Sequence, residues 1–507
     1  MNQTEEKPSK LEIALSFDDV TLDQGYADFL PQEADVTTHL TRNVRHNIPI
    51  ISAAMDTITE SRMAIEMAQL GGSGVIHRNL AIDKQVEEVR KVKNAWNLVV
   101  QNPLTVNPSQ TLREAKRIMN QTSFGGLPVV DQNQLVGIIT SKDTKYFTDL
   151  DTPVSAMMTG ATHLLHIMYS QQISQAEYFR TAEKMFQSHK IDHLPLVIVE
   201  DGKFILKGLI TYEDARKRRK YKNACLVDDR LVVGAAVGCK LEGKNNDIER
   251  AEALLKEGKV DYLVIDSSHG FSKGVVETLK KLREALGNQV DIVAGNVCNG
   301  AAAEELIKYG ADAVKVGVGP GSICTTRRQT GAGVPQITAT YRAALAAVKS
   351  GVPIITDGGI EYPGHAAKSI AAGASCVMVG SVLSGTYETP GMILVRDGKK
   401  VKTYRGMGSL DAMLGGSADR YAEDVEDLDL RGDDVVDLPL EQGISATVTY
   451  KGRVYRIVNE FVQGIKHGMG LAGCRTIAEM KDVEKFYTKF KMVTAEGQRE
   501  SGIHGLK

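Results

Sequence analysis

The stretch VGVGPGSICTTRRQTGAGVPQ, residues 316–336, begins at the end of the apolar run 313–318 and is rich in glycine. Glycines let a backbone turn tightly and bring its N–H and C=O groups against a ligand, because no Cβ obstructs the approach. An apolar run that ends in such a loop is typical of a parallel strand whose carboxyl end carries the chemistry of an α/β fold. The loop holds one thiol, Cys324, which is either a small buried filler or a nucleophile, and this position favours the nucleophile.

Apolar runs of strand length recur on both sides of this stretch and alternate with helix-like segments. The eight runs span residues 48–55, 71–77, 231–237, 262–265, 290–294, 313–318, 353–356 and 376–379. Eight βα units with nearly continuous apolar strands predict an α/β fold of the closed (β/α)8 TIM barrel type. An open doubly wound sheet is the alternative, and the lack of a GxGxxG after an early strand disfavours it.

Between the second and third of these runs, the βα alternation stops, and residues 96–222 consist of two related halves. Each half contains a helix-like segment, a Leu-Pro strand, a turn and the pattern Gly-x-Ile-Thr-x-x-Asp, which ends at Asp143 and again at Asp214. An internal repeat of about 70 residues predicts a separate unit. We therefore expect a discontinuous barrel domain, residues 1–95 and 223–507, that is interrupted by an inserted repeat domain.

Composition restricts the partners of the chain. The formal net charge is −2 and the isoelectric point about 6.6, so no general basic field favours nucleic acid or an anionic membrane. Six scattered cysteines without a CxxC pair suit a reducing compartment. No apolar run approaches the roughly 18 residues of a membrane span, and the first ten residues lack an apolar signal core. These features predict a cytoplasmic protein that acts on small molecules.

Polar and glycine residues follow several of the predicted strands. Asp357, Gly358 and Gly359 follow the seventh strand, and Gly380 and Ser381 follow the eighth. Loops after strands seven and eight of such barrels commonly bind phosphate through backbone N–H groups, so we expect a phosphorylated ligand. DSSHG at residues 266–270 and Gly295-Asn296 follow strands four and five, where carboxylate, hydroxyl and amide groups suit a ribose or an amide.

The region 383–450 departs from the βα pattern. It contains YRGMGSLDAM at residues 404–413, GGSADRY at residues 415–421, and a run at residues 423–437 with eight acidic residues and one arginine. Long loops of this kind inside a compact domain are usually lids. We expect a mobile flap.

Together, the Cys324 loop, DSSHG, the Asp357 turn, Gly380-Ser381 and the segment from YRGMGSLDAM to DRY resemble the inosine-5′-monophosphate (IMP) dehydrogenase family, in its form with two inserted CBS motifs. The resemblance runs from about residue 11 to the C-terminus. It implies NAD-dependent oxidation of IMP to xanthosine monophosphate (XMP), the committed step of guanine nucleotide synthesis. It also implies that residues 96–222 are a tandem CBS regulatory domain.

In this family the thiolate at the position of Cys324 adds to C2 of the hypoxanthine ring, and hydride passes to NAD⁺. The resulting thioimidate is then hydrolysed. The resemblance implies that a flap carrying Arg420 and Tyr421 fills the vacated cofactor site, with Arg420 activating the water. Thr326 would hold that water together with a flap side chain. We align Gln442 at this position, where many bacterial relatives have glutamate, and its neighbour Glu441 is the other candidate.

The same resemblance implies four sets of binding residues. The IMP set is Met55, Ser322, Asp357, Gly358, Gly359, Gly380, Ser381, Tyr404, Arg405, Gly406, Met407, Gly408 and Gln442. The NAD set is Asp266, Ser267, Ser268, Asn296, Gly317, Val318 and Gly319. The potassium set is Gly319, Gly321 and Cys324, completed by Glu500, Ser501 and Gly502 of a neighbouring subunit, which implies a homotetramer, with an octamer as the alternative. The set for regulatory adenine or guanine nucleotides is Thr140, Asp143, Thr211 and Asp214.

Two other functions remain open from the sequence. GMP reductase shares the barrel and a very similar cysteine loop but runs from GMP with NADPH and releases ammonia. It has no need of a hydrolytic flap, so DRY at residues 419–421 disfavours it. A non-catalytic nucleotide sensor built on the CBS pair is the other alternative, and the intact Cys324, Thr326 and Arg420 disfavour it.

Overall fold

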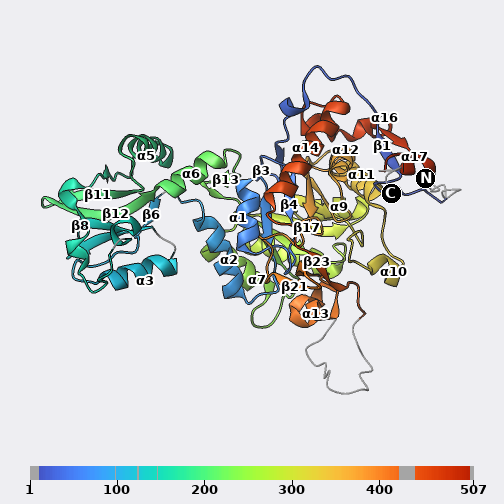
Figure 1. The fold of residues 1–507 in the computed structure, drawn as a ribbon. Coiled ribbons are helices and arrows are strands. Elements are labelled where there is room, and N and C mark those ends of the chain that lie inside the picture. The colour runs from blue at the N-terminus through green and yellow to red at the C-terminus, as the bar shows by residue number, and fades with distance from the viewer. Residues whose placement is uncertain (1–10, 98, 123–124, 146, 422–439, 503–507) are drawn as a thin grey trace. The chain divides into compact units, whose positions relative to one another are not determined.

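The computed structural model describes residues 11–97, 99–122, 125–145, 147–421 and 440–502 (Figure 1). The chain divides into two compact units, the first made of residues 1–95 and 223–507 and the second of residues 96–222. The second unit therefore interrupts the first in sequence.

The first unit is built on a closed barrel of eight parallel strands. Their order around the barrel is β15-β16-β17-β18-β19-β20-β4-β5, and the last strand pairs with the first. The strands are β4 (Ile50–Ser52), β5 (Ser73–Ile76), β15 (Gly234–Val237), β16 (Tyr262–Asp266), β17 (Asp291–Val297), β18 (Ala313–Val316), β19 (Ile354–Asp357) and β20 (Cys376–Val379). The predicted barrel is confirmed, because all eight apolar runs supply a strand.

Helices follow the barrel strands in the expected alternation, and most of them are labelled in Figure 1. They are α1 (Ser61–Gln69), α2 (Ile82–Asn94), α7 (Asp247–Ala253), α8 (Lys273–Leu286), α9 (Gly300–Lys308), α11 (Gln336–Ala347), α12 (Pro363–Ala371) and α14 (Tyr455–Leu471). Side-chain caps start several of them. Ser272 accepts a hydrogen bond from the Val275 N–H at the start of α8, and Asn299 accepts one from the Ala302 N–H at the start of α9.

Apolar side chains fill the barrel interior, among them Val264, Val293 and Ile355. The largest of these side chains is Tyr262, whose hydroxyl lies 2.6 Å from the Ser73 hydroxyl oxygen. That contact satisfies the only polar group on the ring, as a buried phenol requires.

The described part of the region 383–450 contains regular structure. A three-stranded antiparallel sheet joins β21 (Leu394–Arg396), β22 (Lys399–Arg405) and β23 (Ser445–Thr449). Pairing of Tyr404 with Ala446 brings the start of the YRGMGS segment beside residues that lie about 40 positions later. The acidic run at residues 423–437 lies outside the described residues.

The second unit repeats one arrangement of helix, hairpin and helix. In the first half, α3 (Leu112–Thr122) precedes β7 (Gly126–Asp131), β8 (Gln134–Thr140) and α4 (Ser141–Thr144). In the second half, α5 (Gln175–His189) precedes β11 (His193–Glu200), β12 (Lys203–Thr211) and α6 (Tyr212–Lys220). The two hairpins share one sheet with β6 (Val99–Gln101), β9 (Thr159–Gly160) and β10 (Ile167–Met168).

Short elements complete the first unit. The strands are β1 (Val20–Leu22), β2 (Thr38–His39), β3 (Arg45–His46), β13 (Leu226–Val227), β14 (Arg230–Leu231) and β24 (Phe490–Met492), and β1 pairs with β24. The helices are α10 (Thr326–Thr330), α13 (Leu410–Ala412), α15 (Ile477–Met480), α16 (Phe486–Lys489) and α17 (Ala495–Glu500). None of the helices in the described part of the chain combines the length and apolar character needed to cross a membrane.

Gly234 tests the packing of the barrel interior. A Cβ at this position would overlap the Tyr262 ring, which is fully buried and anchored on Ser73. We expect Gly234→Ala to lower the free energy of unfolding by about 1–3 kcal/mol, the usual range for overpacking a filled core. Denaturant unfolding measures the change. Gly364→Ala is the matched control, because nothing lies near its added Cβ in α12. An equal loss in both variants would contradict this account.

Candidate active site

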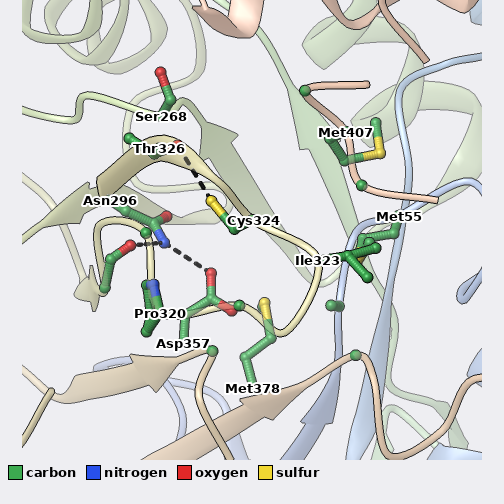
Figure 2. Close-up of a pocket in the computed structure, with 18 of the residues that line it drawn as sticks. Met55, Ser268, Asn296, Pro320, Ile323, Cys324, Thr326, Asp357, Met378 and Met407 are labelled. Atoms are coloured by element: carbon green, nitrogen blue, oxygen red, sulfur yellow. Dashed lines mark hydrogen bonds between the residues drawn. The ribbon is translucent and has the colours of Figure 1, made fainter. Parts of the chain in front are cut away.

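A cavity lies at the carboxyl ends of the barrel strands, and Cys324 is at its centre. In Figure 2, Cys324 lies between Thr326 and Asp357, while Met55 and Met407 lie on the other side of the space. The strand-end residues that line it include Asp266, Asn296, Gly317, Gly358, Gly359, Gly380 and Ser381. Cys324 is half-buried, so its thiol is reachable from the cavity.

The local turn after β18 positions Cys324. Gly317 has φ +147°, and a Cβ there would overlap the backbone oxygen of Asp357, so only glycine fits between the two strand ends. The Cys324 N–H donates to the Gly321 carbonyl at 3.0 Å, which closes the turn before α10. The Cys324 Sγ then lies 3.2 Å from the Thr326 hydroxyl oxygen. Thiol and hydroxyl therefore share one edge of the cavity.

Gln442, rather than Glu441, supplies the side chain that faces Thr326. The Thr326 hydroxyl donates to Gln442 Oε1 at 3.0 Å, and the Thr325 N–H donates to the Gln442 carbonyl at 3.0 Å. Only the backbone carbonyl of Glu441 reaches this loop, 3.5 Å from the Thr325 hydroxyl. The group beside Thr326 is therefore a carboxamide and not a carboxylate.

Arg420 and Tyr421 lie inside the same cavity. The Arg420 guanidinium pairs with the carboxylate of Asp266, and both the N–H and the hydroxyl of Ser268 donate to the Arg420 carbonyl, at 3.2 and 2.8 Å. Burial lowers the pKa of Arg420 below its usual range, with Tyr421 acting in the opposite direction. Burial raises the pKa of the Tyr421 phenol, and Arg420 opposes that rise. In this arrangement the partner of the guanidinium is the Asp266 carboxylate.

A buried cluster of polar groups lines part of the cavity and is centred on Lys315. Its ammonium donates to Asp357 Oδ2 at 2.6 Å, to Asp266 Oδ1 at 3.1 Å and to Asn296 Oδ1. The Asn296 amide in turn donates to Asp357 Oδ2 at 2.9 Å and to the Gly317 carbonyl at 2.8 Å. These contacts join the ends of β16, β17, β18 and β19.

Other parts of the cavity lining offer backbone groups and a phenol. Gly358 and Gly359 have φ of +88° and +77°, left-handed conformations that favour glycine. Tyr404 is buried, and burial raises the pKa of its phenol to about 12, although a hydrogen bond with Ser322 opposes the rise. A neutral phenol, a serine hydroxyl and glycine N–H groups together suit an anionic oxygen ligand.

Most of the residues predicted from the sequence line this cavity, and three groups do not. The Arg405 guanidinium turns away and makes a two-pronged ion pair with Asp56, with the closest contact at 2.6 Å. The Ser267 hydroxyl accepts a hydrogen bond from the His269 N–H at 3.3 Å. Glu500, Ser501 and Gly502 lie at the end of α17, away from the residues that line the cavity. Arg405 is therefore not among the residues that line the cavity.

A second cavity lies in the second unit and holds half of the predicted regulatory set. Its lining residues are Ile138, Thr140, Lys142, Asp143, Thr159, His163, Leu164, Leu165, Lys190, Ile191, Asp192 and His193. Thr140 and Asp143 belong to it, whereas Thr211 and Asp214 do not. In both halves the threonine hydroxyl donates to the aspartate carboxylate, at 2.7 and 2.6 Å.

Lys315 is the main cavity residue that the sequence analysis missed. The only signal was a lysine inside the otherwise apolar run 313–318, at a position that a parallel strand buries. A buried ammonium requires charged or polar partners, so this lysine pointed to carboxylates on neighbouring strands. The analysis also missed apolar lining residues, among them Ile323, Ile360 and Met378.

A closed (β/α)8 barrel that gathers a thiol, paired carboxylates and glycine turns at its carboxyl rim defines a barrel enzyme with a small-molecule site. The chain belongs to the IMP dehydrogenase/GMP reductase family, because the model described as "IMP dehydrogenase / GMP reductase domain" matches residues 14–504.

Sequence relatives and solved structures agree on this family and differ in the activity that they name. Inosine-5′-monophosphate dehydrogenase from Yersinia pestis is 46% identical over 495 residues, covering 97% of this chain and 96% of that protein. The enzyme of the same name from Aquifex aeolicus is 45% identical over 507 residues, covering 99% and 97%. A cysteine-to-alanine variant of GMP reductase from Trypanosoma brucei, in complex with guanosine 5′-monophosphate, has a TM-score of 0.84 and 36% identity and covers 100% of both chains.

The six thiols should differ in their reactivity. Burial raises the pKa of Cys225 to about 12 and raises that of Cys376 further, so both remain protonated at pH 8. We expect iodoacetamide at pH 8 to alkylate Cys324 well before Cys225 or Cys376. Peptide mass spectrometry over a time course measures the order. The Cys324→Ser variant is the control, and alkylation of Cys376 at the rate of Cys324 would contradict the expected burial.

Proposed function

We propose that this protein catalyses NAD-dependent oxidation of IMP to XMP through a covalent intermediate on Cys324. The observation that carries the proposal is the presence of Cys324, the Thr326–Gln442 pair and Arg420 in one cavity. A nucleophile and a separate water-activating group are the two functions that this oxidation requires.

In the first step the Cys324 sulfur adds to C2 of the hypoxanthine ring, the C2–N3 double bond opens and the thiol proton passes to N3. The new S–C bond makes C2 tetrahedral. C2 then releases its hydrogen as hydride, which NAD⁺ would accept, and N3 loses its proton as the C2–N3 double bond forms again. The product is a thioimidate, an oxidised carbon held by the enzyme. The cysteine thus divides one difficult oxidation into an addition and an elimination.

In the second step water attacks the thioimidate carbon, the S–C bond breaks and XMP leaves with the water oxygen. Thr326 lies beside the thiol and supports a role in holding that water. Because Gln442 is a carboxamide, it cannot accept a proton at neutral pH as a carboxylate could. We therefore assign proton removal to Arg420. This role requires the guanidinium to leave Asp266 and lose its proton, and burial, which lowers the pKa of Arg420, acts in that direction.

Substrate binding is assigned to the two sides of the cavity. Asp357 would accept hydrogen bonds from the ribose hydroxyls. Gly359, Gly380, Ser381, Ser322 and Tyr404 would hold the phosphate, together with Gly358 and the backbone of Arg405 and Gly406. Met55 and Met407 are opposite Cys324 and would flank the base with Gly408, consistent with their place in Figure 2.

The residues around Arg420 fit the nicotinamide half of NAD. Asp266 and Ser268 supply a carboxylate and a hydroxyl, and the backbone of Gly317 to Gly319 borders the same space. When bound, NAD⁺ accepts the hydride that C2 of the substrate releases. Arg420 and Tyr421 lie on this subsite, so we infer that the segment enters it only when the subsite is vacant. Water is thereby excluded during oxidation and admitted afterwards.

Backbone oxygens of the cysteine loop fit a monovalent cation. Within the described chain, the Gly319 and Cys324 carbonyls receive no hydrogen bond, and the Gly321 carbonyl receives one. Carbonyl oxygens suit a hard ion such as K⁺. We assign K⁺ to these carbonyls, with Glu500, Ser501 and Gly502 of a neighbouring subunit completing the site in a homotetramer or an octamer.

The second unit is proposed to be a tandem CBS domain that binds regulatory adenine or guanine nucleotides. The support is its internal repeat and the cavity that contains Thr140 and Asp143. Lys142 and Lys190 line the same cavity and offer positive charge to nucleotide phosphates, with Lys142 paired to Asp192 in this structure. The free state of all six cysteines fits the cytoplasmic location that we expect.

GMP reductase is the second candidate, favoured by the likeness to the Trypanosoma brucei structure over the full chain. That reaction, in which GMP is reduced with NADPH and ammonia is released, does not need a hydrolytic flap. The placement of Arg420 and Tyr421 beside Cys324 therefore favours the dehydrogenase. It also disfavours a purely non-catalytic nucleotide sensor.

An absorbance assay at 340 nm tests the proposed function. Purified protein with IMP, NAD⁺ and K⁺ is expected to form NADH in step with XMP, and Cys324→Ala is expected to form neither. Substantial NADH from Cys324→Ala would overturn the covalent mechanism. Consumption of NADPH in the presence of GMP, without NADH formation from IMP, would assign the reductase activity instead.

Arg420 separates the two chemical steps. We expect Arg420→Ala to retain a burst of NADH but to lose about 100-fold or more in steady-state turnover, since only water activation is removed. Rapid-mixing absorbance measures the burst and its following rate. Because Gln442 provides no carboxylate, Gln442→Glu in the Arg420→Ala background is expected to recover part of the turnover. Loss of the burst itself would place Arg420 in the first step.

A further inference from the structure

We propose that Lys315 is a positioning residue that presents Asp357 to the nucleotide sugar and joins it, through Asp266, to the flap cation Arg420. The inference deepens the proposed function and rests on it. None of the roles described above uses Lys315, although its ammonium touches the carboxylates of two predicted subsites.

The hydrogen bonds of Lys315 exclude a direct role in the reaction. An ammonium has three N–H donors. Lys315 directs them to Asp266, Asn296 and Asp357, and its side chain is about 1% exposed. All three donors are thus engaged by protein groups, although the side chain borders the cavity. Lys315 must therefore act through the groups that it holds.

The contact with Asp357 determines which oxygen faces the cavity. Lys315 and the Asn296 amide both donate to Oδ2 of Asp357, at 2.6 and 2.9 Å. No described residue donates to Oδ1, which is left for ligand hydroxyls. Two donors on one oxygen hold the carboxylate plane in place before the nucleotide arrives, and such preorganisation lowers the cost of binding.

The contact with Asp266 connects this arrangement to the flap. Lys315 donates to Oδ1 of Asp266, and Arg420 pairs with Oδ2 of the same carboxylate. Two carboxylates and one ammonium leave the buried cluster with one excess negative charge, and Arg420 makes it neutral. Because an uncompensated buried charge is costly, this excess favours one cation at the Asp266 side. Lys315 thus sets both the sugar contact and the charge that attracts Arg420.

Removal of the ammonium should therefore affect a ligand that Lys315 does not touch. In Lys315→Met, two buried carboxylates would face each other without their shared cation. We expect the affinity for IMP, measured by calorimetry on the full-length protein without NAD, to fall by about tenfold or more. A second substitution, Asp266→Asn, removes the excess charge and is expected to recover part of that affinity in the Lys315→Met background.

Lys93→Met is the matched control. Lys93 is also a buried lysine, and it donates to both oxygens of Asp261, at 2.8 and 2.7 Å, and to the Leu231 carbonyl at 3.1 Å. Asp261 precedes β16, whereas Asp266 ends it, so the two ion pairs lie at opposite ends of one strand. Both methionine variants are expected to lower the melting temperature, but only Lys315→Met is expected to weaken IMP binding.

The outcomes separate this inference from the proposed function. If the unaltered protein binds IMP and Lys315→Met binds it within about twofold of that affinity, Lys315 is only structural and the inference is overturned. If the unaltered protein does not bind IMP, both the inference and the proposed function are overturned. Should Lys315→Met fail to fold, the double variant with Asp266→Asn is compared with Asp266→Asn alone. Equal IMP affinities in that pair would also overturn the inference.

Discussion

Closure of the barrel is the constraint on which the rest of the first unit depends. β4, near the start of the chain, pairs with β20 on one side and with β5 on the other, and β5 pairs with β15 beyond the inserted unit. Because all eight strands are parallel, closure brings their carboxyl ends to one rim. Met55, Cys324 and Gly380 then line one cavity, although hundreds of residues separate the first from the others. The inserted unit leaves this closure intact, since it enters after α2 and before β15.

The rim of the barrel contains buried charged side chains, and each of them needs a partner of opposite charge to be stable there. Asp266, Lys315 and Asp357 end adjacent or nearly adjacent strands, and each has a partner of opposite charge. A carboxylate buried alone at this depth would take up a proton or destabilise the fold. The pairing therefore does two things at once. It gives each buried charge at the strand ends a partner, and it places two carboxylates in the cavity that holds the Cys324 thiol.

The sequence predicted the barrel well because its signal is local. Each strand is a short apolar run, and each rim motif follows directly on its strand, so Asp357 and Gly380 could be placed without knowledge of the tertiary structure. Side-chain direction was not predictable in the same way. The Arg405 guanidinium turns to Asp56, 349 residues earlier, and Gln442 was separated from Glu441 only by the pairing of its segment with the Cys324 loop. Lys315 was hidden because its strand was read as a single apolar run.

The fold by itself is compatible with an oxidation and with a reduction. Relatives named as IMP dehydrogenase and a solved GMP reductase both match this chain almost end to end. The barrel and the cysteine loop therefore do not decide the direction of chemistry. What differs is whether the covalent intermediate must meet water. In the proposed oxidation, C2 of the substrate remains bound to the enzyme sulfur as a thioimidate, and water must release it. The group that activates this water would enter after hydride transfer. In this chain Asp266 offers one carboxylate oxygen to the Lys315 ammonium and the other to Arg420. The cluster thus receives its neutralising charge from Arg420, a residue far from the barrel strands in sequence.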